Sequence, residues 1–543
     1  MKIAGAWSGH DCSYFIMEDG RPVRHDEYER FIREKEPPGD ALSFLMENYD
    51  GFSEIKHLAM CSPVSKTTHY SESFEKIKEI IGKNGGNLYV VGHHKAHAAN
   101  TFFSSNLPEA TIITMDGGGV EENNFVTAFT IWTGSGNKIQ HLHSFPIAHL
   151  NIGGLWTRAT RYIFKLQSGW PRGHQAGSVM AMAALGDPER FVDDFEKMLT
   201  VDLQMASHKP TNQPKGALVP GKDPRHPYLN PWAMIAEQSE KDKFDLAAGL
   251  QLATENLFKN TLEAILNQVP TKNICLAGGV SLNSVLVGKI RDWFPQIESV
   301  YVTPTPHDGG LPIGAAQFVW HHVLDNPRIE WKDNFTPYLG RTYAEEEIRE
   351  CLEQVSDDIV IRNADDAEVI QLLDDQNIVS VFGGGSESGR RALGNRSILA
   401  DPRSPNMKDM INEKVKHRQW YRPFAPSILR EETGSWFESD VNSPYMSFVL
   451  NFKESSLDKI PAVLHVDNTA RLQTVTENDN PWYHSFLKRW NEKTGVPILL
   501  NTSFNDREPI CETPEHAVKC FLRTNIDCLY FRDCGLLISK TDK

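Results

Sequence analysis

The sequence of 543 residues lacks several features that would define its class at once. It has no uninterrupted apolar run near the roughly 18–20 residues of a membrane-spanning helix, so we expect no membrane segment. Its eight cysteines run from Cys12 to Cys534 without a CxxC spacing, which gives no zinc motif and suits reduced thiols. The first residues lack the apolar core of a signal peptide, and we therefore expect a cytoplasmic protein.

The chain also has no excess of basic residues, because 71 Asp and Glu residues outnumber 56 Lys and Arg residues. The formal net charge of −15 argues against a general nucleic-acid-binding protein, although a local basic groove remains compatible with it. Hydrophobic residues make up 40% of the chain and charged residues 23%, which are ordinary values for a globular protein. The length predicts about two to four domains.

A strand followed by two histidines stands near residue 90. Residues 87–91 predict a buried strand, and Gly92 ends it. In a helix that begins there, His93 and His97 lie four residues apart on one face. Imidazoles so placed can share a metal ion, with Asp116 supplied from the end of the next strand. The pair alone is weak evidence for a metal site, and two capped or hydrogen-bonded surface histidines are the more common case.

Glycine-rich turns favour the metal interpretation. Residues 117–119 are three glycines, where the backbone can approach a phosphate closely. A later strand, 299–302, leads to Asp308 and two more glycines. Two Asp-Gly-Gly turns about 190 residues apart are typical of a duplicated actin-like ATPase core. Carboxylates at such turns hold a divalent metal such as Mg²⁺ against phosphate oxygens.

Other segments leave two interpretations open. The Gly278-Gly279 turn after the predicted strand 273–277 suits a nucleotide contact, but also plain packing. The charged run 27–35 reads most simply as a solvated face, although its basic residues could line an anion pocket. Residues 206–228 predict a long, locally basic surface loop.

The pattern restarts near residue 342, and basic residues then gather late in the chain. Lys416 and Arg418 are predicted on a strand, where they share a face and converge on one anion. Ser503 and Asn505 follow another predicted strand and also share a face. Basic side chains opposite such donors suit a phosphate or acyl phosphate, although each cluster alone could be a surface ion-pair network.

These motifs resemble the O-carbamoyltransferases of the nodulation and antibiotic-tailoring type, such as tobramycin and cephamycin carbamoyltransferases. The resemblance covers nearly the whole length. It implies an α/β protein with a duplicated actin-like (ASKHA) domain over 1–342 and an α/β YrdC-like domain over 343–543. The matching motifs are His10-Asp11, Arg30-Phe31 with Arg33 and Lys35, His93 with His97, 116–118, 278–280 with Asn283, 308–310, 391–397, Lys416 with Arg418, 422–426 and 501–505.

The resemblance implies two half-reactions. In the second domain carbamoyl phosphate and ATP give carbamoyladenylate and pyrophosphate, and in the first the carbamoyl group passes to an acceptor hydroxyl beside Fe²⁺ or another divalent metal. The implied metal ligands are His93, His97, Asp116 and Asp308. The implied nucleotide-binding residues are Gly117, Gly118, Gly278, Gly279, Asn283 and Gly309. The implied carbamoyl phosphate and ATP ligands are Arg391, Arg396, Lys416, Arg418, Arg422, Asn501, Ser503 and Asn505.

The expected catalytic residues are His10, Asp11, Lys416 and Arg418. His10 is the expected general base because an imidazole titrates near neutral pH, and Asp11 is the alternative. The sequence departs from the family at 176–178, which leaves the acceptor pocket open, and at 384–391, which leaves open whether Arg390 replaces a missing basic residue.

The sequence does not define the acceptor. A small hydroxylated metabolite is favoured, with a hydroxymethylpyrimidine in a nucleotide or DNA as the alternative, and a homodimer is compatible with the chain. Two other classes compete. A threonylcarbamoyl-type tRNA-modifying enzyme would need a basic RNA-binding surface. A non-catalytic actin-like ATPase scaffold would leave the basic and Ser/Asn clusters unexplained.

Overall fold

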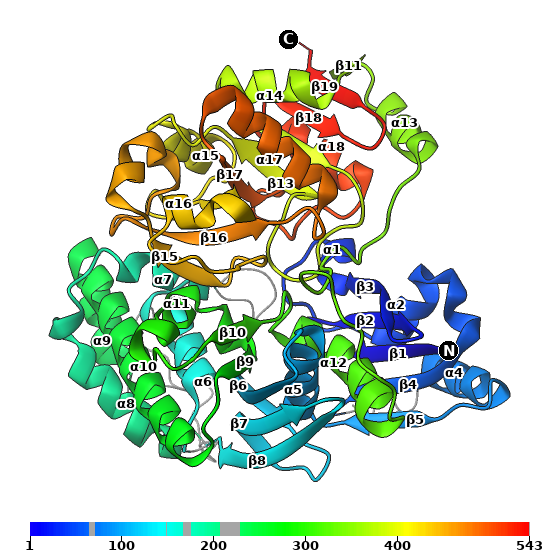
Figure 1. Cartoon of the computed structure of the whole chain (residues 1–543), viewed down its shortest axis with the longest axis vertical. Coiled ribbons are helices and arrows are strands. Elements are labelled where there is room, and N and C mark those ends of the chain that lie inside the picture. Colours follow the sequence, from blue (N-terminus) through cyan, green and yellow to red (C-terminus); the bar gives the residue numbers. More distant parts are fainter. Residues whose placement is uncertain (64–70, 148, 167–174, 207–228, 542–543) are drawn as a thin grey trace, which may run out of the picture. The chain divides into compact units, whose positions relative to one another are not determined.

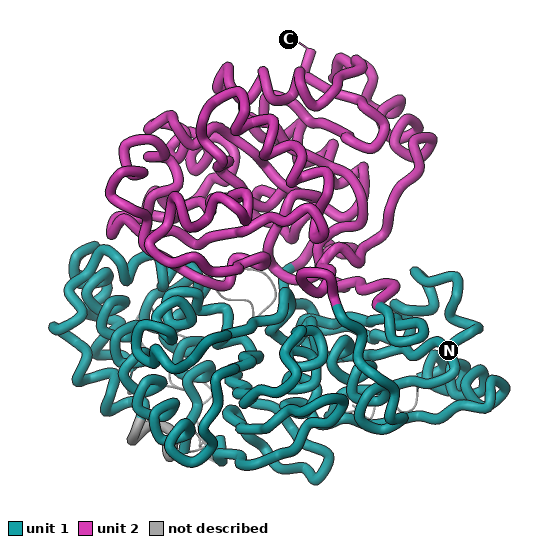
Figure 2. The backbone as a smooth tube through the Cα atoms, in the orientation of Figure 1, with its two compact units in different colours: residues 1–21, 35–330 teal, residues 22–34, 331–543 magenta. Residues whose placement is uncertain are grey.

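The computed structural model describes residues 1–63, 71–147, 149–166, 175–206 and 229–541. Most of the predicted loop 206–228 lies outside these residues. The described chain divides into two compact units, unit 1 (1–21 and 35–330) and unit 2 (22–34 and 331–543), shown in two colours in Figure 2. The domain boundary near residue 342 stays a prediction, and the assignment of 22–34 to unit 2 was not anticipated.

Unit 1 contains two sheets whose strand orders match when one of them is read in reverse (Figure 1). Of strand β3 in the first sheet, residues 22–27 are counted with unit 2. In the first sheet, of order β3-β2-β1-β4-β5, β1 runs antiparallel to β2 and parallel to β4. In the second, of order β10-β9-β6-β7-β8, β6 runs antiparallel to β7 and parallel to β9. The strands are β1 (Lys2–Trp7), β2 (Ser13–Glu18), β3 (Arg21–Glu27), β4 (Ile55–Cys61), β5 (Leu88–Val91), β6 (Glu109–Val120), β7 (Val126–Ser135), β8 (Lys138–Pro146), β9 (Asn273–Ala277) and β10 (Ser299–Val302).

This repeat is the duplicated α/β arrangement of actin-like proteins, as the sequence predicted. The helices of unit 1 are α2 (Ala41–Asn48), α4 (Glu72–Lys83), α5 (His93–Ser104), α6 (Ile152–Arg158), α7 (Ala176–Ala183), α8 (Val192–Ala206), α9 (Asn230–Ala236), α10 (Glu240–Gln268), α11 (Ser284–Trp293) and α12 (Leu311–Gln317). Among the helices of the described residues, none has the length and apolar character needed to cross a membrane.

Helix α5 is held at close range by its neighbours. A Cβ on Gly314 of α12 would lie 1.8 Å from the Ala96 carbonyl oxygen, so α12 can approach α5 only with glycine there. At the other end, the Arg328 guanidinium donates to the Phe102 and Leu107 carbonyls at 2.8 and 2.5 Å and covers the Phe102 ring. Phe102 belongs to the last turn of α5, and Leu107 follows the helix, so one guanidinium ties the helix end to the segment after it. Helix α5 is therefore anchored along its length.

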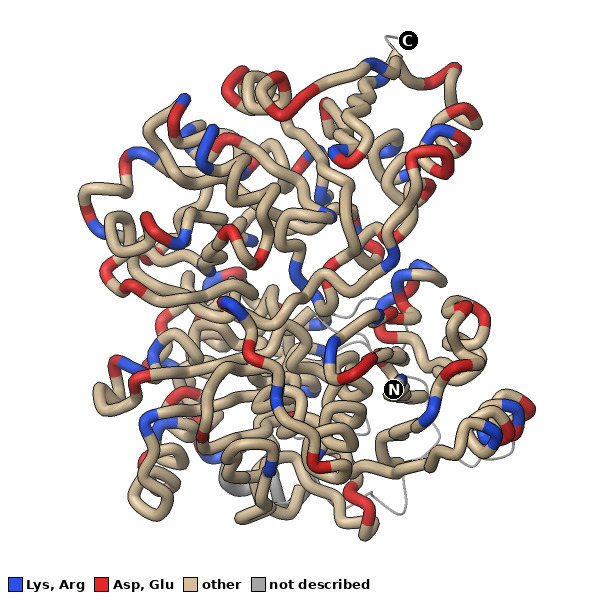
Figure 3. The backbone as a smooth tube through the Cα atoms, turned by 45° about the vertical axis from the view of Figure 1, so that its right-hand side comes forward, with Lys and Arg blue, Asp and Glu red and all other residues tan. Residues whose placement is uncertain are grey.

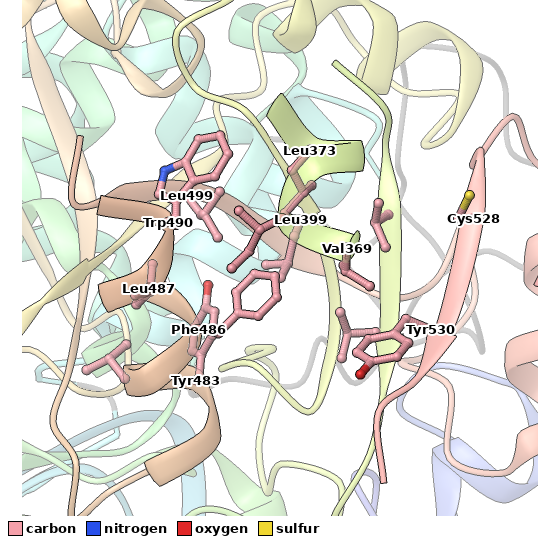
Figure 4. Packing of buried hydrophobic residues seen from close by; sticks show 14 of the residues in the cluster. Val369, Leu373, Leu399, Tyr483, Phe486, Leu487, Trp490, Leu499, Cys528 and Tyr530 are labelled. Carbon is pink, nitrogen blue, oxygen red and sulfur yellow. The ribbon is translucent and has the colours of Figure 1, made fainter. Parts of the chain in front are cut away.

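Unit 2 contains one mixed nine-stranded sheet of order β11-β19-β18-β12-β13-β17-β14-β16-β15. Its strands are β11 (Ile359–Asn363), β12 (Val379–Phe382), β13 (Arg396–Ala400), β14 (Ala425–Leu429), β15 (Phe448–Asn451), β16 (Thr469–Val475), β17 (Ile498–Ser503), β18 (Cys528–Phe531) and β19 (Leu536–Lys540). Its helices are α1 (Tyr28–Ile32), α13 (Glu345–Glu353), α14 (Asp366–Asp374), α15 (Met407–Lys414), α16 (Thr433–Trp436), α17 (Pro481–Thr494) and α18 (Pro514–Arg523). Helices α14 and α17 pack their apolar faces on this sheet, and Figure 4 shows the core around Phe486 and Trp490.

Two predictions about local burial are wrong. Strand β5 stands at the end of its sheet, and Val90 is 46% exposed, so this strand is not buried. The charged run 27–35 is not a solvated face, because Glu27 and Arg30 are buried in unit 2. Arg30 lies 2.7 Å from Glu27 and 3.7 Å from Glu512. A pattern of charged residues reports composition, whereas burial depends on partners elsewhere in the chain.

The predicted strand through Lys416 and Arg418 is also wrong. Helix α15 ends at Lys414, and the chain then continues irregularly with His417 in the left-handed region at a φ of 44°. The two basic side chains therefore do not share a strand face. Their partners, described below, are different.

Candidate metal centre and anion-binding site

The first turn of α5 is held by two carboxylates from the end of β6. Glu122 accepts a hydrogen bond from the Gly92 N–H at 2.8 Å, and Glu121 accepts one from the His94 N–H at 2.7 Å. Carboxylates at a helix start satisfy free N–H groups and complement the helix dipole. Neither residue belongs to a predicted motif. A capping acid 27 or 30 residues further along the chain leaves no local signal in the sequence.

Helix α5 presents His93 and His97 to the aspartates of the two Asp-Gly-Gly turns. Asp116 Oδ2 lies 3.3 Å from His93 Nε2 and 3.2 Å from His97 Nε2. Asp308 Oδ1 lies 3.5 and 3.4 Å from the same two nitrogens. One ligand atom from each of the four side chains lies within 4.8 Å of the others. The structure thus brings together the four predicted ligands, and we call this set the His-Asp cluster.

The cluster concentrates charge away from water. Burial lowers the pKa of His93, but the carboxylates of Asp308 and Asp116 outweigh it and raise this pKa to about 10. Conversely, the histidines hold the pKa of Asp116 at about 2, although burial and the Asp308 charge oppose them. The two carboxylates repel each other, so either protons or a cation must sit between them. Protons and a metal ion therefore compete for the same imidazole nitrogens.

The donor set fits a divalent metal. Two imidazole nitrogens and two carboxylate oxygens converge, a combination that suits first-row divalent metals. The Nδ1 atoms of His93 and His97 are buried and have no hydrogen-bond partner among the described residues. The rings are instead oriented by packing, since Trp7 contacts His93 edge-on at 5.6 Å between ring centres. A Cβ on Gly119 would lie 2.2 Å from the His93 ring, so only glycine leaves room for it.

Between the two ligands, His94 is locked by a chain of hydrogen bonds. Its Nε2 lies 3.0 Å from the Thr127 carbonyl and must donate, so its Nδ1 accepts from the Thr114 hydroxyl at 2.6 Å. Thr114 in turn accepts from Thr130 at 2.6 Å, which accepts from the Trp132 indole N–H at 2.6 Å. Burial first, and the neighbouring histidines second, lower the pKa of His94 to about 3, so the ring stays neutral.

The His10-Asp11 pair lies beside the cluster. His10 Nδ1 is 2.9 Å from Asp11 Oδ2, and its Nε2 is 3.4 Å from Asp308 Oδ2. Burial lowers the pKa of His10, but the charges of Asp308 and Asp11 raise it to about 9. His10 is then protonated at neutral pH unless a cation offsets Asp308. The choice between His10 and Asp11 as general base stays open.

The predicted nucleotide glycines line adjoining turns. Gly278 has a φ of 87°, and a Cβ there would lie 2.1 Å from the Met115 carbonyl oxygen. A Cβ on Gly279 would lie 3.2 Å from Asp116 Oδ1, whereas Gly117 has no atom closer than 3.9 Å. The side chain of Asn283 caps α11 by accepting from the Leu286 N–H at 3.2 Å. Nucleotide binding by Gly117, Gly118, Gly278, Gly279, Asn283 and Gly309 stays a prediction.

In unit 2, Lys416 is buried among oxygen acceptors. Its ammonium donates to the Ser503 carbonyl at 2.6 Å, and to the Asn505 carbonyl and Oδ1 at 2.8 and 2.5 Å. It also approaches Ser503 Oγ at 3.3 Å. Lys416 therefore contacts Ser503 and Asn505 directly, and the prediction that these residues bind carbamoyl phosphate or ATP stays a prediction. Arg418 instead donates to Asn412 Oδ1 at 2.8 Å.

Several guanidinium groups of unit 2 influence one another, and we call Arg391, Arg418, Arg422 and Arg471 the arginine cluster. Burial and the charges of Arg471, Arg390 and Arg422 hold the pKa of Arg391 well below its usual range. Burial and the charges of Arg422 and Arg418 lower that of Arg471 to about 10. The Nε atoms of Arg391 and Arg471 are buried without a hydrogen-bond partner among the described residues. Such a set of like charges favours a bound anion.

Arg471 lies on β16, outside every predicted motif. Two other predicted ligands have contacts within the protein. The buried Arg396 guanidinium donates to the carbonyls of Gly383 and Gly384 at 2.9 and 3.2 Å and stacks on Phe382. Asn501 donates to the Ala392 carbonyl at 3.1 Å. Their roles as substrate ligands stay predictions.

The duplicated sheets and the His-Asp cluster define an actin-like α/β protein with a candidate divalent-metal site. Two family profiles match the chain, one described as Carbamoyltransferase N-terminus over 69–317 and one as Carbamoyltransferase C-terminus over 370–538. Nodulation protein NolNO of Sinorhizobium fredii is 32% identical over 562 residues, covering 96% of this chain and 78% of that protein. The chain belongs to the carbamoyltransferase family, a class of enzymes, which confirms the resemblance.

Two further similarities were found. A 3'-hydroxymethylcephem-O-carbamoyltransferase of Amycolatopsis lactamdurans is 31% identical over 349 residues, covering 63% of this chain and 61% of that protein. Among solved structures, full-length HypF in its phosphate- and nucleotide-bound form matches with a TM-score of 0.35 and 16% identity, over 60% of this chain and 56% of that chain.

Proposed function

We propose that this protein is an ATP-dependent O-carbamoyltransferase. Unit 2 would form carbamoyladenylate in two steps. Water would first release phosphate from carbamoyl phosphate, and the resulting carbamate oxygen would then attack the α-phosphorus of ATP and displace pyrophosphate. Unit 1 would pass the carbamoyl group to an acceptor hydroxyl, with AMP as the leaving group. The observation that supports the proposal is that one chain contains both a buried cluster of arginines and a buried cluster of histidines and aspartates. The arginine cluster favours a bound anion, and the His-Asp cluster favours either protons or a bound cation.

The activation step assigns a role to each basic group. The arginine cluster would bind the phosphates and stabilise charge that develops on them. Lys416 would position Ser503 and Asn505, since its ammonium binds both residues. These two side chains would then orient the carbamoyl group. We also propose that unit 2 is YrdC-like.

The transfer step uses the residues of unit 1. His93, His97, Asp116 and Asp308 would hold Fe²⁺ or another divalent ion, which when bound neutralises phosphate oxygens and polarises the carbamoyl carbonyl. The glycine turns beside Asp116 would admit the nucleotide phosphates, with Mg²⁺ as a further counterion. His10 or Asp11 would take the proton of the attacking hydroxyl.

The acceptor remains to be identified, and a small hydroxylated metabolite is the favoured class. Figure 3 shows acidic and basic residues mixed along the described chain of both units, which suits a small molecule better than RNA or DNA. The alternatives are a hydroxymethylpyrimidine nucleotide, DNA, or a tRNA of the threonylcarbamoyl type. A panel of hydroxylated acceptors, followed by mass spectrometry for the gain of one carbamoyl group, separates these classes.

Two variants test the division of labour. Lys416→Ala should abolish pyrophosphate release from ATP and carbamoyl phosphate, because its positive charge holds Ser503 and Asn505 in place. His93→Ala should retain pyrophosphate release but lose acceptor carbamoylation. Lys414→Ala, an exposed lysine at the end of α15, is the matched control. Normal adenylate formation by Lys416→Ala would contradict the proposal.

A further inference from the structure

A pair of buried cysteines lies in unit 2, close enough to Lys416 for its charge to act on Cys520. Cys511 precedes α18 and Cys520 lies within it, and the two are 0% and 1% exposed. Together with Glu508, their ligand atoms all lie within 4.8 Å of one another. The Cys511 thiol donates to the His516 carbonyl at 3.4 Å. Two thiols this close form either a metal site or a redox pair.

The charges around the sulfurs disfavour a metal ion. Glu508 pairs with Arg33 at 3.5 Å and with Arg523, and it also accepts from the backbone N–H groups of 506 and 507. The Glu508 carboxylate therefore already has hydrogen-bond and ion-pair partners and is a poor candidate for a metal ligand. The charges of Lys416 and Arg523 also act on Cys520. The charge of Glu508 acts on Cys520 in the opposite sense, but this carboxylate already pairs with Arg33 and Arg523, so it offers little to a cation placed between the sulfurs.

The same charges make the two sulfurs unequal. The hydrogen bond with Cys511 first, and then the charges of Lys416 and Arg523, lower the pKa of the Cys520 thiol, although burial and the Glu508 charge oppose this. Burial raises the pKa of Cys511 well above its usual range. One sulfur is therefore favoured as the thiolate that attacks, and the other remains a thiol that can resolve.

We propose that Cys511 and Cys520 are a reversible redox site, at which a hydroperoxide such as hydrogen peroxide forms a disulfide. The Cys520 sulfur attacks the peroxide O–O bond, which gives a sulfenic acid and one water. The Cys511 sulfur then attacks that sulfur, and the second oxygen leaves as water. Overall, two thiols and one hydrogen peroxide give one disulfide and two waters, and an added dithiol reverses the step.

The disulfide has a structural consequence for the anion site. The Cys511 N–H donates to the Phe504 carbonyl at 2.9 Å, so residues 504–511 form one turn that carries Asn505. Bonded sulfurs stand about 2 Å apart, so closure pulls this turn toward α18. Asn505 provides two of the oxygen acceptors of Lys416. Oxidation should therefore disturb the Lys416 contacts, a functional effect that rests on the proposed activation step.

The chemical step can be tested without any activity assay. Trypsin cleaves after Arg507, Lys519 and Arg523, so the disulfide would link peptides 508–519 and 520–523. We expect this linked pair after hydrogen peroxide treatment of the whole native protein, and its loss after dithiothreitol. Cys351→Ser, at another buried cysteine, should leave the linkage intact, whereas Cys520→Ser should remove it. Absence of the linked pair in the wild-type protein, or one tightly held Zn²⁺ per chain that Cys520→Ser releases, would overturn the proposal.

The functional step is read from pyrophosphate release. We expect oxidation to lower the wild-type rate at subsaturating carbamoyl phosphate about tenfold, the size expected for weakening one hydrogen bond to a charged group. Dithiothreitol should restore it, and Cys511→Ser should be insensitive to peroxide. A linked pair without a rate change would overturn the regulatory role but leave the redox site. Absence of pyrophosphate release from the reduced protein would instead contradict the proposed function.

Discussion

Unit 1 and unit 2 each bury a group of charged side chains, but the groups differ in kind. The His-Asp cluster mixes imidazoles and carboxylates, so its members raise and lower each other's pKa values in a compensating manner. The arginine cluster contains charges of one sign, and its members lower each other's pKa values. The first cluster can balance itself with protons, whereas the second is relieved only by an anion.

This difference predicts how each cluster affects the free energy of folding. A mixed cluster can stabilise the fold before its ligand binds, because opposite charges attract. A cluster of like charges costs folding free energy that ligand binding recovers, which is a common relation between stability and activity at functional sites. Substitutions should therefore change stability in opposite directions in the two units.

The largest expected effect comes from removing one carboxylate of the His-Asp cluster. Asp308→Asn should lower the affinity for a divalent metal. Replacing a residue that only hydrogen-bonds a metal ligand costs roughly 10–100-fold in affinity, and we expect a larger loss here because Asp308 is itself a proposed ligand. Elemental analysis after equilibration with Fe²⁺ measures it. Pyrophosphate release in unit 2 should persist.

Asp325→Asn is the matched control, because Asp325 is an exposed acid of unit 1 that pairs with Lys138. It should keep the metal content of the wild-type protein. Loss of pyrophosphate release in Asp308→Asn would show that the two sites do not act separately, and would remove the basis of the comparison.

An intermediate effect is expected from Arg471→Ala. The KM for carbamoyl phosphate or ATP should rise about 10–100-fold, the range for losing a hydrogen bond to a charged group. At the same time, Tm should rise. The folded-state pKa of Arg471 lies below its ordinary value, so the charge opposes folding at every pH below about 10, and its removal relieves that cost.

Each 1 kcal/mol relieved corresponds to roughly 2–4 °C in Tm for a domain of this size. Arg489→Ala is the control of opposite sign, because Arg489 pairs with Asp366 on the same unit. It should lower Tm slightly and leave both KM values unchanged. A lower Tm for Arg471→Ala would contradict the picture of a repulsive cluster.

The smallest effect is expected from Thr114→Val, which removes the donor to His94. Leaving the buried Nδ1 unpaired should cost about 1–3 kcal/mol of unfolding free energy. Denaturant unfolding measures this cost. Thr111→Val, at a buried position on the same strand but outside the hydrogen-bond chain, should cost less. Equal costs would show that the chain does not hold His94.

Much of the fold of unit 1 was predictable because its signals are local. The predicted strands 273–277 and 299–302 match β9 and β10, since short apolar runs ended by Gly or Pro mark strands. The shared helix face of His93 and His97 likewise follows from their separation of four positions. The prediction that Asp116 and Asp308 lie at one site depended on the two Asp-Gly-Gly turns. These turns are a sequence sign of the duplicated arrangement.

The remaining features were decided by tertiary structure. Arg30 is buried because Glu512, far along the chain, pairs with it, and no charge pattern reveals that partner. Lys416 and Arg418 do not share a strand, because His417 turns the backbone between them. The sequence by itself determined the strands, the helix bearing two histidines and the two aspartate turns, since these arise from neighbouring residues. Only the tertiary structure brought Arg471 into the arginine cluster and Cys511 beside Cys520, because burial and charge repulsion depend on residues that the fold brings into contact.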